Sequence, residues 1–194
     1  MTAQFESCDF LHYGISSEDD QHTGLQSQQL GFAEQLVQLI KDSVEPNSRV
    51  LLDGPSFGFA AQVLADSNYQ VSWLYHESRQ ISKNFLYQNL IIDDRKLINF
   101  EIGEKFELIL IEGSYQYLKQ LELMTKSREL LVESGLLIMF GEYLSDNFQR
   151  KYSTLPNLSS MRQLSKSLNC DVVSEIDFTK DAMSTIETLQ KKFW

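Results

Sequence analysis

The sequence predicts an α/β protein built on a doubly wound, mostly parallel sheet. Three observations lead to this fold class. A short apolar run ends in a glycine turn and then a helix-like segment over residues Arg49–Ala65. Phe106–Ile111 is nearly continuous in apolar residues, as is typical of a strand that helices cover on both faces. Strand-like and helix-like segments alternate along the chain, which favours parallel strands joined by helical crossovers.

The length and composition favour a single domain over residues 1–194. The chain has 194 residues, of which 42% are hydrophobic and 23% are charged, so it has the length and apolar content to bury a core. Residues 1–27 are polar, with an acidic cluster at Glu18–Asp20, and we expect a loop-rich N-terminal segment there. No repeat or linker pattern indicates a second domain.

The charge and the cysteines narrow the expected partners and compartment. A formal net charge of −10 disfavours general binding to nucleic acid or anionic membranes, because their phosphates repel an acidic surface. Cys8 and Cys170 are too far apart in sequence to form a metal-binding motif, and such sparse cysteine is typical of reduced intracellular proteins. The first residues lack the basic and apolar regions of a signal peptide, so a cytoplasmic location is expected.

The first half of the chain is expected to begin with a helix and continue as strands joined by crossover helices. Within Gln28–Val44 apolar residues recur at helical spacing, and Glu45–Ser48, which contains a proline, ends that helix. The elements expected next are the strand Arg49–Leu52, the helix Phe59–Asp66, the strand Val71–Tyr75 and the helix His76–Leu90.

The second half is expected to add five strands and two helices. The strands are Lys96–Phe100, Phe106–Ile111, Leu136–Phe140, Asp171–Phe178 and Ser184–Gln190, and the helices are Tyr117–Val132 and Ser159–Leu168. Ser184–Gln190 alternates as a half-covered edge strand does, and a turn at Thr179–Asp181 would fold the last two strands into a hairpin. The prediction is therefore a seven-stranded sheet with an antiparallel C-terminal strand.

Three stretches are expected to meet where ligands bind in such sheets, at the carboxyl ends of the strands. They are Asp53–Gly58, Tyr75–Glu77 and Glu112–Tyr115. The first of them joins a strand to a helix, which brings backbone N–H groups and a helix N-terminus up to a ligand. Gly54 and Gly58 either contact that ligand or only permit the tight turn.

In this order the elements resemble the class I S-adenosylmethionine-dependent methyltransferases over roughly residues 10–192. The segments that carry the resemblance are Leu11–Gly14, the first glycine motif in Arg49–Ala65, the second strand in Val71–Ser78, the fourth-strand motif in Phe106–Tyr115 and the glycine turn with the fifth strand in Leu130–Ile138. The resemblance implies a Rossmann-like methyltransferase fold, with helices on both faces of the sheet, and S-adenosylmethionine as the cofactor.

The resemblance also implies cofactor-binding positions, and the chain departs from the family at several of them. The acid of the first motif falls on Leu52, with Asp53 one residue later, and Ser56 replaces the middle glycine. The acid that holds the ribose falls on Tyr75, which lacks the two acceptor oxygens of a carboxylate. The implied cofactor-binding residues are Asp53, Gly54, Ser56, Gly58, Tyr75, Glu77 and Glu104. We expect Gly58→Leu to abolish cofactor binding and leave the fold intact.

Glu112 and His12 are the candidate catalytic residues. In the family that the chain resembles, the position of Glu112 lies beside the methyl group, and His12 lies in a segment similar to the lid, where a base takes a proton from a substrate hydroxyl. Tyr13 and Tyr115 are candidate substrate-lining residues. Glu112 and Glu142 could together hold Mg²⁺, but we interpret them as solvated strand-end residues and predict no metal site.

The leading functional interpretation is methyl transfer from S-adenosylmethionine to a small molecule. The altered motifs support an alternative of another class, a methyltransferase-like protein that has lost the cofactor and acts as a binding or scaffolding partner, as a homodimer or with another protein. A remote alternative is a hydrolase, because Gly54–Gly58 spells a nucleophile elbow around Ser56. That chemistry needs a histidine late in the chain, and His76 is the only histidine after Ser56.

Overall fold

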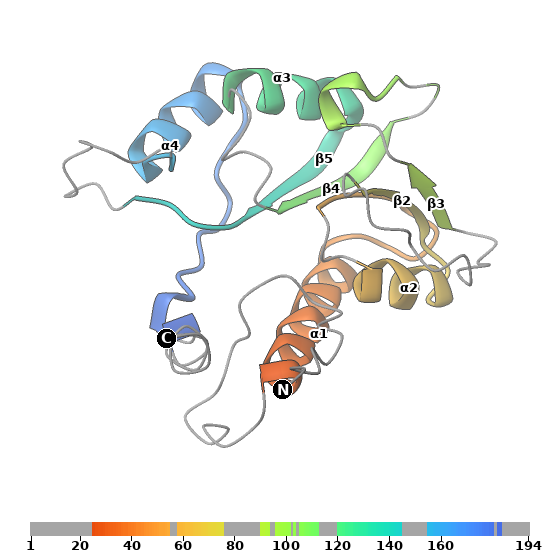
Figure 1. The fold of residues 1–194 in the computed structure, drawn as a ribbon. Coiled ribbons are helices and arrows are strands. Elements are labelled where there is room, and N and C mark those ends of the chain that lie inside the picture. The colour runs from red at the N-terminus through yellow and green to blue at the C-terminus, as the bar shows by residue number, and fades with distance from the viewer. Residues whose placement is uncertain are drawn as a thin grey trace, which may run out of the picture.

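The computed structural model describes residues 25–54, 58–75, 90–93, 96–101, 103, 105–112, 120–144, 155–180 and 182–183. These residues form a layered α/β structure (Figure 1). Its elements in chain order are α1 (Leu25–Ser43), β1 (Arg49–Asp53), α2 (Gly58–Asp66), β2 (Gln70–Leu74), β3 (Leu90–Asp93), the 3-10 turn η2 (Leu97–Asn99), β4 (Phe106–Glu112), α3 (Gln120–Leu130), β5 (Leu131–Phe140) and α4 (Leu158–Ser167).

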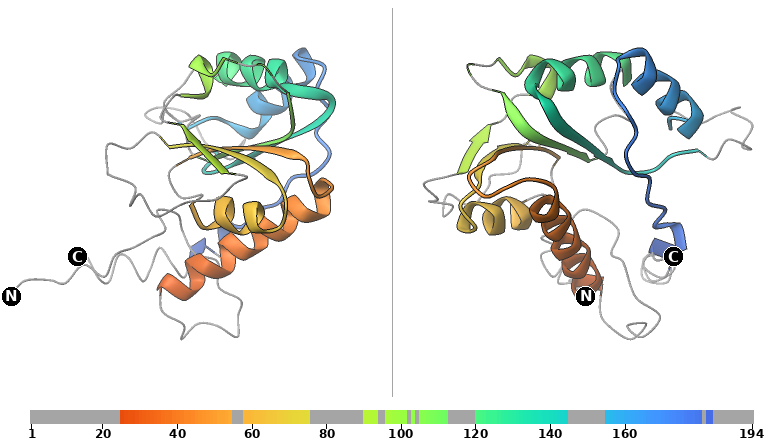
Figure 2. Two further views of the ribbon diagram at one scale, coloured as in Figure 1. Left: turned by 90° about the vertical axis from the view of Figure 1, so that its right-hand side faces the viewer. Right: turned by 180° about the vertical axis from the view of Figure 1, so that it is seen from behind.

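The five described strands form one sheet in the order β3-β2-β1-β4-β5, and every neighbouring pair is parallel. Helices α1 and α2 cover one face of this sheet, and α3 and α4 cover the other (Figures 1 and 2). Strand β1 is central, between β2 and β4. The chain runs from β1 through β2 to β3 at one edge, and then returns to β4 and β5 on the other side of β1. Because such crossovers are right-handed, this reversal places helices on both faces of the sheet. The predicted α/β class with a mostly parallel sheet is confirmed.

Two apolar clusters fill the space between the sheet and its helices. Along β1 the side chains alternate, so that Val50 and Leu52 join the cluster under α1 and α2, whereas Leu51 joins the cluster under α3. All three side chains are fully buried. Burial on both faces explains why the central strands are nearly continuous in apolar residues.

The third strand differs from its sequence prediction. Lys96–Phe100 was expected as a strand, but it contains the turn η2, which buries Leu97 in the cluster under α3. The third strand is Leu90–Asp93, which pairs with Val71–Leu74 of β2. The predicted helix His76–Leu90 therefore extends too far at Leu90, and the rest of it lies outside the described residues. Both segments are short apolar runs. The segment that pairs with β2 contains two adjacent isoleucines, a β-branched residue type that is enriched in strands.

The C-terminal segment also departs from the predicted pattern. Asp171–Phe178, expected as a strand, has no regular secondary structure, and its apolar residues Val172, Val173 and Ile176 are exposed. Ser184–Gln190 lies outside the described residues, so the seven-strand count and the antiparallel strand stay predictions.

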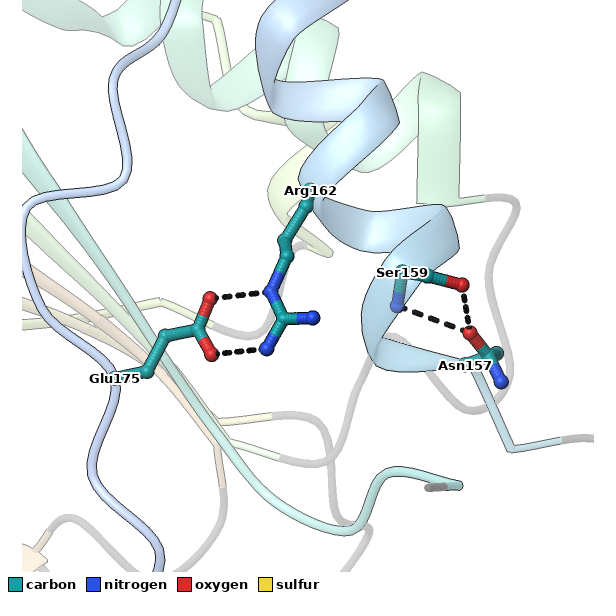
Figure 3. A network of polar contacts seen from close by, with 4 residues as sticks. All are labelled: Asn157, Ser159, Arg162 and Glu175. Carbon is teal, nitrogen blue, oxygen red and sulfur yellow. Dashed lines mark hydrogen bonds and ion pairs between the residues drawn. The ribbon is translucent and has the colours of Figure 1, made fainter. Parts of the chain in front are cut away.

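Side chains rather than a strand ladder hold this segment to the rest of the fold. Arg162 of α4 donates from its Nε and from one terminal guanidinium nitrogen to the two carboxylate oxygens of Glu175, at 2.7 and 2.6 Å (Figure 3). Further along, the ring of Phe178 lies 6.1 Å from that of Phe32 in α1, edge to face. Helix α4 itself begins at a side-chain cap, because Asn157 Oδ1 accepts the backbone N–H of Ser159 at 2.9 Å (Figure 3).

A polar link joins β1 and β4 at their amino ends, opposite to the carboxyl ends of the strands. The Glu107 carboxylate accepts the backbone N–H of Arg49 at 2.7 Å and its guanidinium at 3.3 Å. Burial raises the pKa of the Glu107 carboxyl, but the hydrogen bonds and charge of Arg49 outweigh that effect, so that its pKa is lowered.

Candidate functional site

The carboxyl ends of the parallel strands meet along one edge of the sheet, and the candidate site is built there. Asp53, the last residue of β1, is in register with Leu74 of β2 and Ile111 of β4. Glu112, the last residue of β4, is in register with Phe140 of β5. Two carboxylates thus end the two central strands, as the sequence predicts for a binding edge.

Asp53 is fully buried although it carries a carboxyl group. Among the residues that the structure describes, it and Ser127 are the buried polar residues. By strand alternation Asp53 lies on the α3 face of the sheet with Leu51, whereas Leu52 lies on the opposite face. Its place at the carboxyl end of the central strand makes Asp53 a candidate for binding.

Leu52 occupies the position where the resemblance expects the first acid, and it is part of the apolar core. Its side chain is fully buried in the cluster under α1 and α2, together with Trp73. It supplies no polar atom to a ligand. The next residue, Asp53, lies on the other face of β1.

The junction of β1 and α2 is fixed by contacts to Trp73 of β2. The Trp73 indole N–H donates to the carbonyl oxygen of Gly54 at 2.8 Å in a buried hydrogen bond. The N–H of Gly54 in turn donates to the carbonyl oxygen of Leu74 at 3.3 Å. Gly54 has a φ of 158°, which L side chains rarely adopt, so a glycine is favoured there.

Gly58, the first residue of α2, lies against the same indole. A β-carbon at this position would stand 3.0 Å from Trp73 Cη2 and 3.6 Å from its Cζ2 and Cζ3. The close approach favours glycine whether or not a ligand binds. The expectation that Gly58→Leu leaves the fold intact stays a prediction, and the crowding of a β-carbon against the buried ring counts against it.

Tyr75 follows β2 and packs on the edge of the cluster under α1 and α2. Its ring centroid lies 5.1 Å from that of Trp73, with the planes inclined at 65°. Its phenol offers one O–H group in place of the carboxylate that the resemblance expects at this strand end.

Aromatic side chains surround the end of β5, next to Glu112. Phe140, the register partner of Glu112, packs at 4.5 Å between ring centroids against the buried Phe32 of α1, which in turn contacts Phe178. Cα partners in parallel strands point to the same face, so Glu112 and Phe140 share the face covered by α1. A carboxylate next to these aromatic side chains can bind or deprotonate a small molecule that has both polar and apolar parts.

The other predicted site residues lie outside the described residues: His12, Tyr13, Ser56, Glu77, Glu104 and Tyr115. The structure places Asp53, Gly54, Gly58, Tyr75 and Glu112 at the carboxyl edge of the sheet or at the turns that follow it. Glu142 is exposed two residues beyond the end of β5. The described residues include no group of three or more metal-ligating side chains.

Sequence reasoning missed the two aromatic residues that organise this edge. Trp73 was treated as one residue of a strand, and Phe140 as the end of another. A signal was present for Trp73, because a buried indole N–H needs an acceptor and the nearby glycine turn offers backbone carbonyls. No comparable signal marked Phe140, whose contact with Phe32 joins segments far apart in the chain.

No protein-family model and no curated protein sequence matches the chain. Solved structures do match. Coclaurine N-methyltransferase, crystallised with N-methylheliamine and SAH, matches 66% of this chain with a TM-score of 0.55 and 18% identity. This chain covers 39% of that protein, so it spans well under half of its length.

Two other structures match nearly the whole chain. The [4+2]-cyclase SpnF matches 94% of this chain, which covers 71% of SpnF, with a TM-score of 0.77 and 12% identity. Geranyl diphosphate C-methyltransferase from Streptomyces coelicolor A3(2), in complex with Mg²⁺, geranyl-S-thiolodiphosphate and S-adenosyl-L-homocysteine, matches 92% with a TM-score of 0.76 and 10% identity. This chain covers 76% of that enzyme.

These likenesses establish the fold. The chain has the Rossmann-like fold of the class I S-adenosylmethionine-dependent methyltransferases, as the order of its sequence motifs predicts. In the described part of the chain no helix has the length and apolar character needed to cross a membrane.

Proposed function

We propose that this protein transfers a methyl group from S-adenosylmethionine to a small molecule. The observation that carries the proposal is the carboxyl end of the central strand, where Gly54 follows β1 and Gly58 begins α2. Two methyltransferases with this fold were crystallised with the demethylated cofactor. The length and the cysteine usage favour a single cytoplasmic domain for this activity.

The residues at the strand ends suit different parts of the cofactor. The N–H groups at the start of α2 would face its nucleoside side, and the Tyr75 hydroxyl would donate to the ribose. The Asp53 carboxylate would accept hydrogen bonds from the ammonium group in the methionine part of the cofactor. The cofactor brings a reactive sulfonium, so the protein needs chiefly to position the methyl acceptor and exclude water.

Glu112 would deprotonate the methyl acceptor. It ends β4 beside the aromatic side chains of Phe140 and Phe32, which would contact an apolar part of that molecule. A carboxylate within hydrogen-bond reach of the nucleophilic group would accept its proton as the methyl group is transferred.

Calorimetric titration with S-adenosylhomocysteine tests the cofactor part of this proposal. We expect the wild-type chain to bind with a Kd of about 10 μM or below, corresponding to about 7 kcal/mol. Gly54→Ala should weaken binding because it strains the turn. Gly31→Ala is the matched control, since a β-carbon on Gly31 in α1 meets nothing within 4 Å. Equal affinity in wild type and Gly54→Ala would place the cofactor elsewhere.

A second function has a specific observation in its favour. The position expected to hold the first acid is the buried Leu52, and Tyr75 at the expected ribose position packs against Trp73. Such a chain would serve as a binding or scaffolding partner, and the exposed apolar residues Val172, Val173 and Ile176 would contribute contact surface.

Two measurements separate this second function from the enzyme. A scaffold should show no binding of S-adenosylhomocysteine at millimolar concentration, and sedimentation should reveal a dimer that Val173→Asp weakens. Lys180→Asp, a charge change at an exposed residue of the same region, is the control. Micromolar cofactor binding by a monomer would contradict the scaffold. The hydrolase alternative rests on Ser56, which lies outside the described residues.

A further inference from the structure

The indole ring of Trp73 contacts three of the residues that the proposed function assigns to the cofactor. Its N–H donates to the Gly54 carbonyl, and its six-membered ring lies next to Gly58. The indole also packs against the ring of Tyr75 in an edge-to-face arrangement. Trp73 itself is 4% exposed, so a ligand would contact these neighbours rather than the indole.

The hydrogen bond fixes the direction of the first peptide group of the turn. A carbonyl oxygen that accepts a buried N–H at 2.8 Å is held in one orientation, because breaking the bond leaves both groups unsatisfied. The peptide that carries the Gly54 carbonyl therefore has little freedom to rotate. The preceding peptide group is held as well, because the N–H of Gly54 donates to the carbonyl oxygen of Leu74 on the same neighbouring strand.

The ring contact fixes the other end of the turn. Helix α2 begins at Gly58, and the absence of a side chain lets the first turn of the helix approach the indole directly. The first N–H groups of a helix have no partner within the helix itself. Their position over the sheet is therefore set by the Trp73 ring.

The contact with Tyr75 extends this arrangement to the next strand end. The two rings meet edge to face, with centroids 5.1 Å apart, a geometry that aromatic pairs prefer. One buried side chain thus adjoins both glycines of the first motif and the residue at the expected ribose position.

We propose that Trp73 is a positioning residue that fixes both ends of the turn between Gly54 and Gly58, together with Tyr75, for a nucleoside cofactor. The cofactor part of this inference rests on the proposed function. The contacts of Trp73 with Gly54 and Gly58 are a property of the ligand-free protein, and their effect can be measured without any ligand.

Trp73→Phe tests the inference, with Tyr69→Phe as a matched control. Phenylalanine keeps an aromatic ring but loses the N–H donor and the part of the indole that reaches Gly58. Tyr69 belongs to the same cluster and also donates to a backbone carbonyl, that of Val44 at 3.0 Å. It precedes the opposite end of β2, so its substitution removes a similar bond away from the turn.

Two properties are measured in each variant: amide hydrogen exchange at Gly54 without ligand, and the calorimetric affinity for S-adenosylhomocysteine. We expect Trp73→Phe to speed exchange at Gly54 and weaken binding about 10-fold, and Tyr69→Phe to change neither. Global unfolding is followed for both variants, so that a general loss of stability is recognised by faster exchange at Leu108 in β4 as well.

The outcomes separate this inference from the proposed function. If wild type binds no S-adenosylhomocysteine, the proposed function fails, and exchange at Gly54 alone decides the role of Trp73 in the turn. Selectively faster exchange in Trp73→Phe then supports that role. If wild type binds and both variants bind equally well, Trp73 is a core residue only and the inference is overturned. Unchanged exchange at Gly54 in Trp73→Phe overturns it in either case.

Discussion

Gly58 lies so close to Trp73 that a β-carbon on the glycine would stand 3.0 Å from Cη2 of the indole. The ring is buried and its N–H is bound to Gly54, so it has little room to move away. This contact joins the start of α2 to β2, and it gives the second glycine of the motif a packing role in addition to any role in binding.

Gly58→Ala should therefore destabilise the fold by about 1 kcal/mol, because the cost of overpacking exceeds the gain in helix propensity. In a Trp73→Phe background the same substitution should be neutral or stabilising, since phenylalanine does not reach the position of Cη2. Urea unfolding of the two single variants and the double variant gives the coupling, expected at about 1–2 kcal/mol. Additive effects would show that the two residues do not constrain each other.

Asp53→Asn should weaken binding of S-adenosylhomocysteine by about 10-fold to 100-fold, because a charge-assisted hydrogen bond to the ligand ammonium is lost. The unfolding free energy is measured alongside the affinity, so that a general loss of stability is recognised. Ser127→Ala is the control, because Ser127 is also buried but donates to Leu123 within α3. Undiminished affinity in Asp53→Asn would remove Asp53 from the site.

Glu112→Ala should lower turnover by about 100-fold or more if the carboxylate serves as the acid–base group. Cofactor affinity and unfolding free energy should change little, because a half-buried strand-end carboxylate contributes little packing. The assay follows labelled methyl transfer to an acceptor found by screening. Glu142→Ala removes an exposed carboxylate beyond the next strand and should leave turnover unchanged. Equal losses in both variants would indicate a general charge effect.

Glu107→Gln should make the fold less stable near neutral pH by up to about 1 kcal/mol, a value limited by the partial exposure of the pair. The pKa of Glu107 is lowered in the folded state, so the carboxylate stabilises the fold above its unfolded pKa of about 4.3. This contribution is lost as the pH falls through the folded pKa.

The two proteins should therefore converge in stability in acid, below about pH 4. Thermal unfolding across a pH series measures the difference. Glu129→Gln, which removes one partner of the loose pair with Lys126 at 3.8 Å, should show almost no such difference. A difference in stability between Glu107→Gln and wild type that persists in acid would show that the effect comes from packing rather than from the charge.

The sequence sufficed for the fold where a segment has one dominant pattern. Phe106–Ile111 is apolar throughout, and it forms most of the buried strand β4. The pattern was insufficient at the third strand, because Leu90–Asp93 and Lys96–Phe100 are both short apolar runs. The two segments differ in what they pack against: Leu90–Asp93 pairs with β2, whereas Leu97 packs in the cluster under α3. These contacts join segments distant in the chain, so the local sequence pattern does not reveal them.

The strand ends that make up the candidate site were predicted, but their detailed contacts were not, for a similar reason. The strand ends at Asp53 and Glu112 follow from the apolar runs before them. The face on which Asp53 lies depends on the register of β1 in the sheet, and a shift of one residue would reverse it. The bond from Trp73 to Gly54 joins neighbouring strands, and no periodicity within either segment reveals it.

The most direct test is a nuclear magnetic resonance titration with S-adenosylhomocysteine of protein labelled with ¹⁵N at its nine glycines. Binding over Gly54 and Gly58 predicts saturable shifts of their two amides at about 10 μM Kd, with the amide of Gly31, which lies in α1, unmoved. No glycine shift at about 1 mM ligand, or shifts confined to other glycines, would contradict a methyltransferase that holds its cofactor at this edge of the sheet.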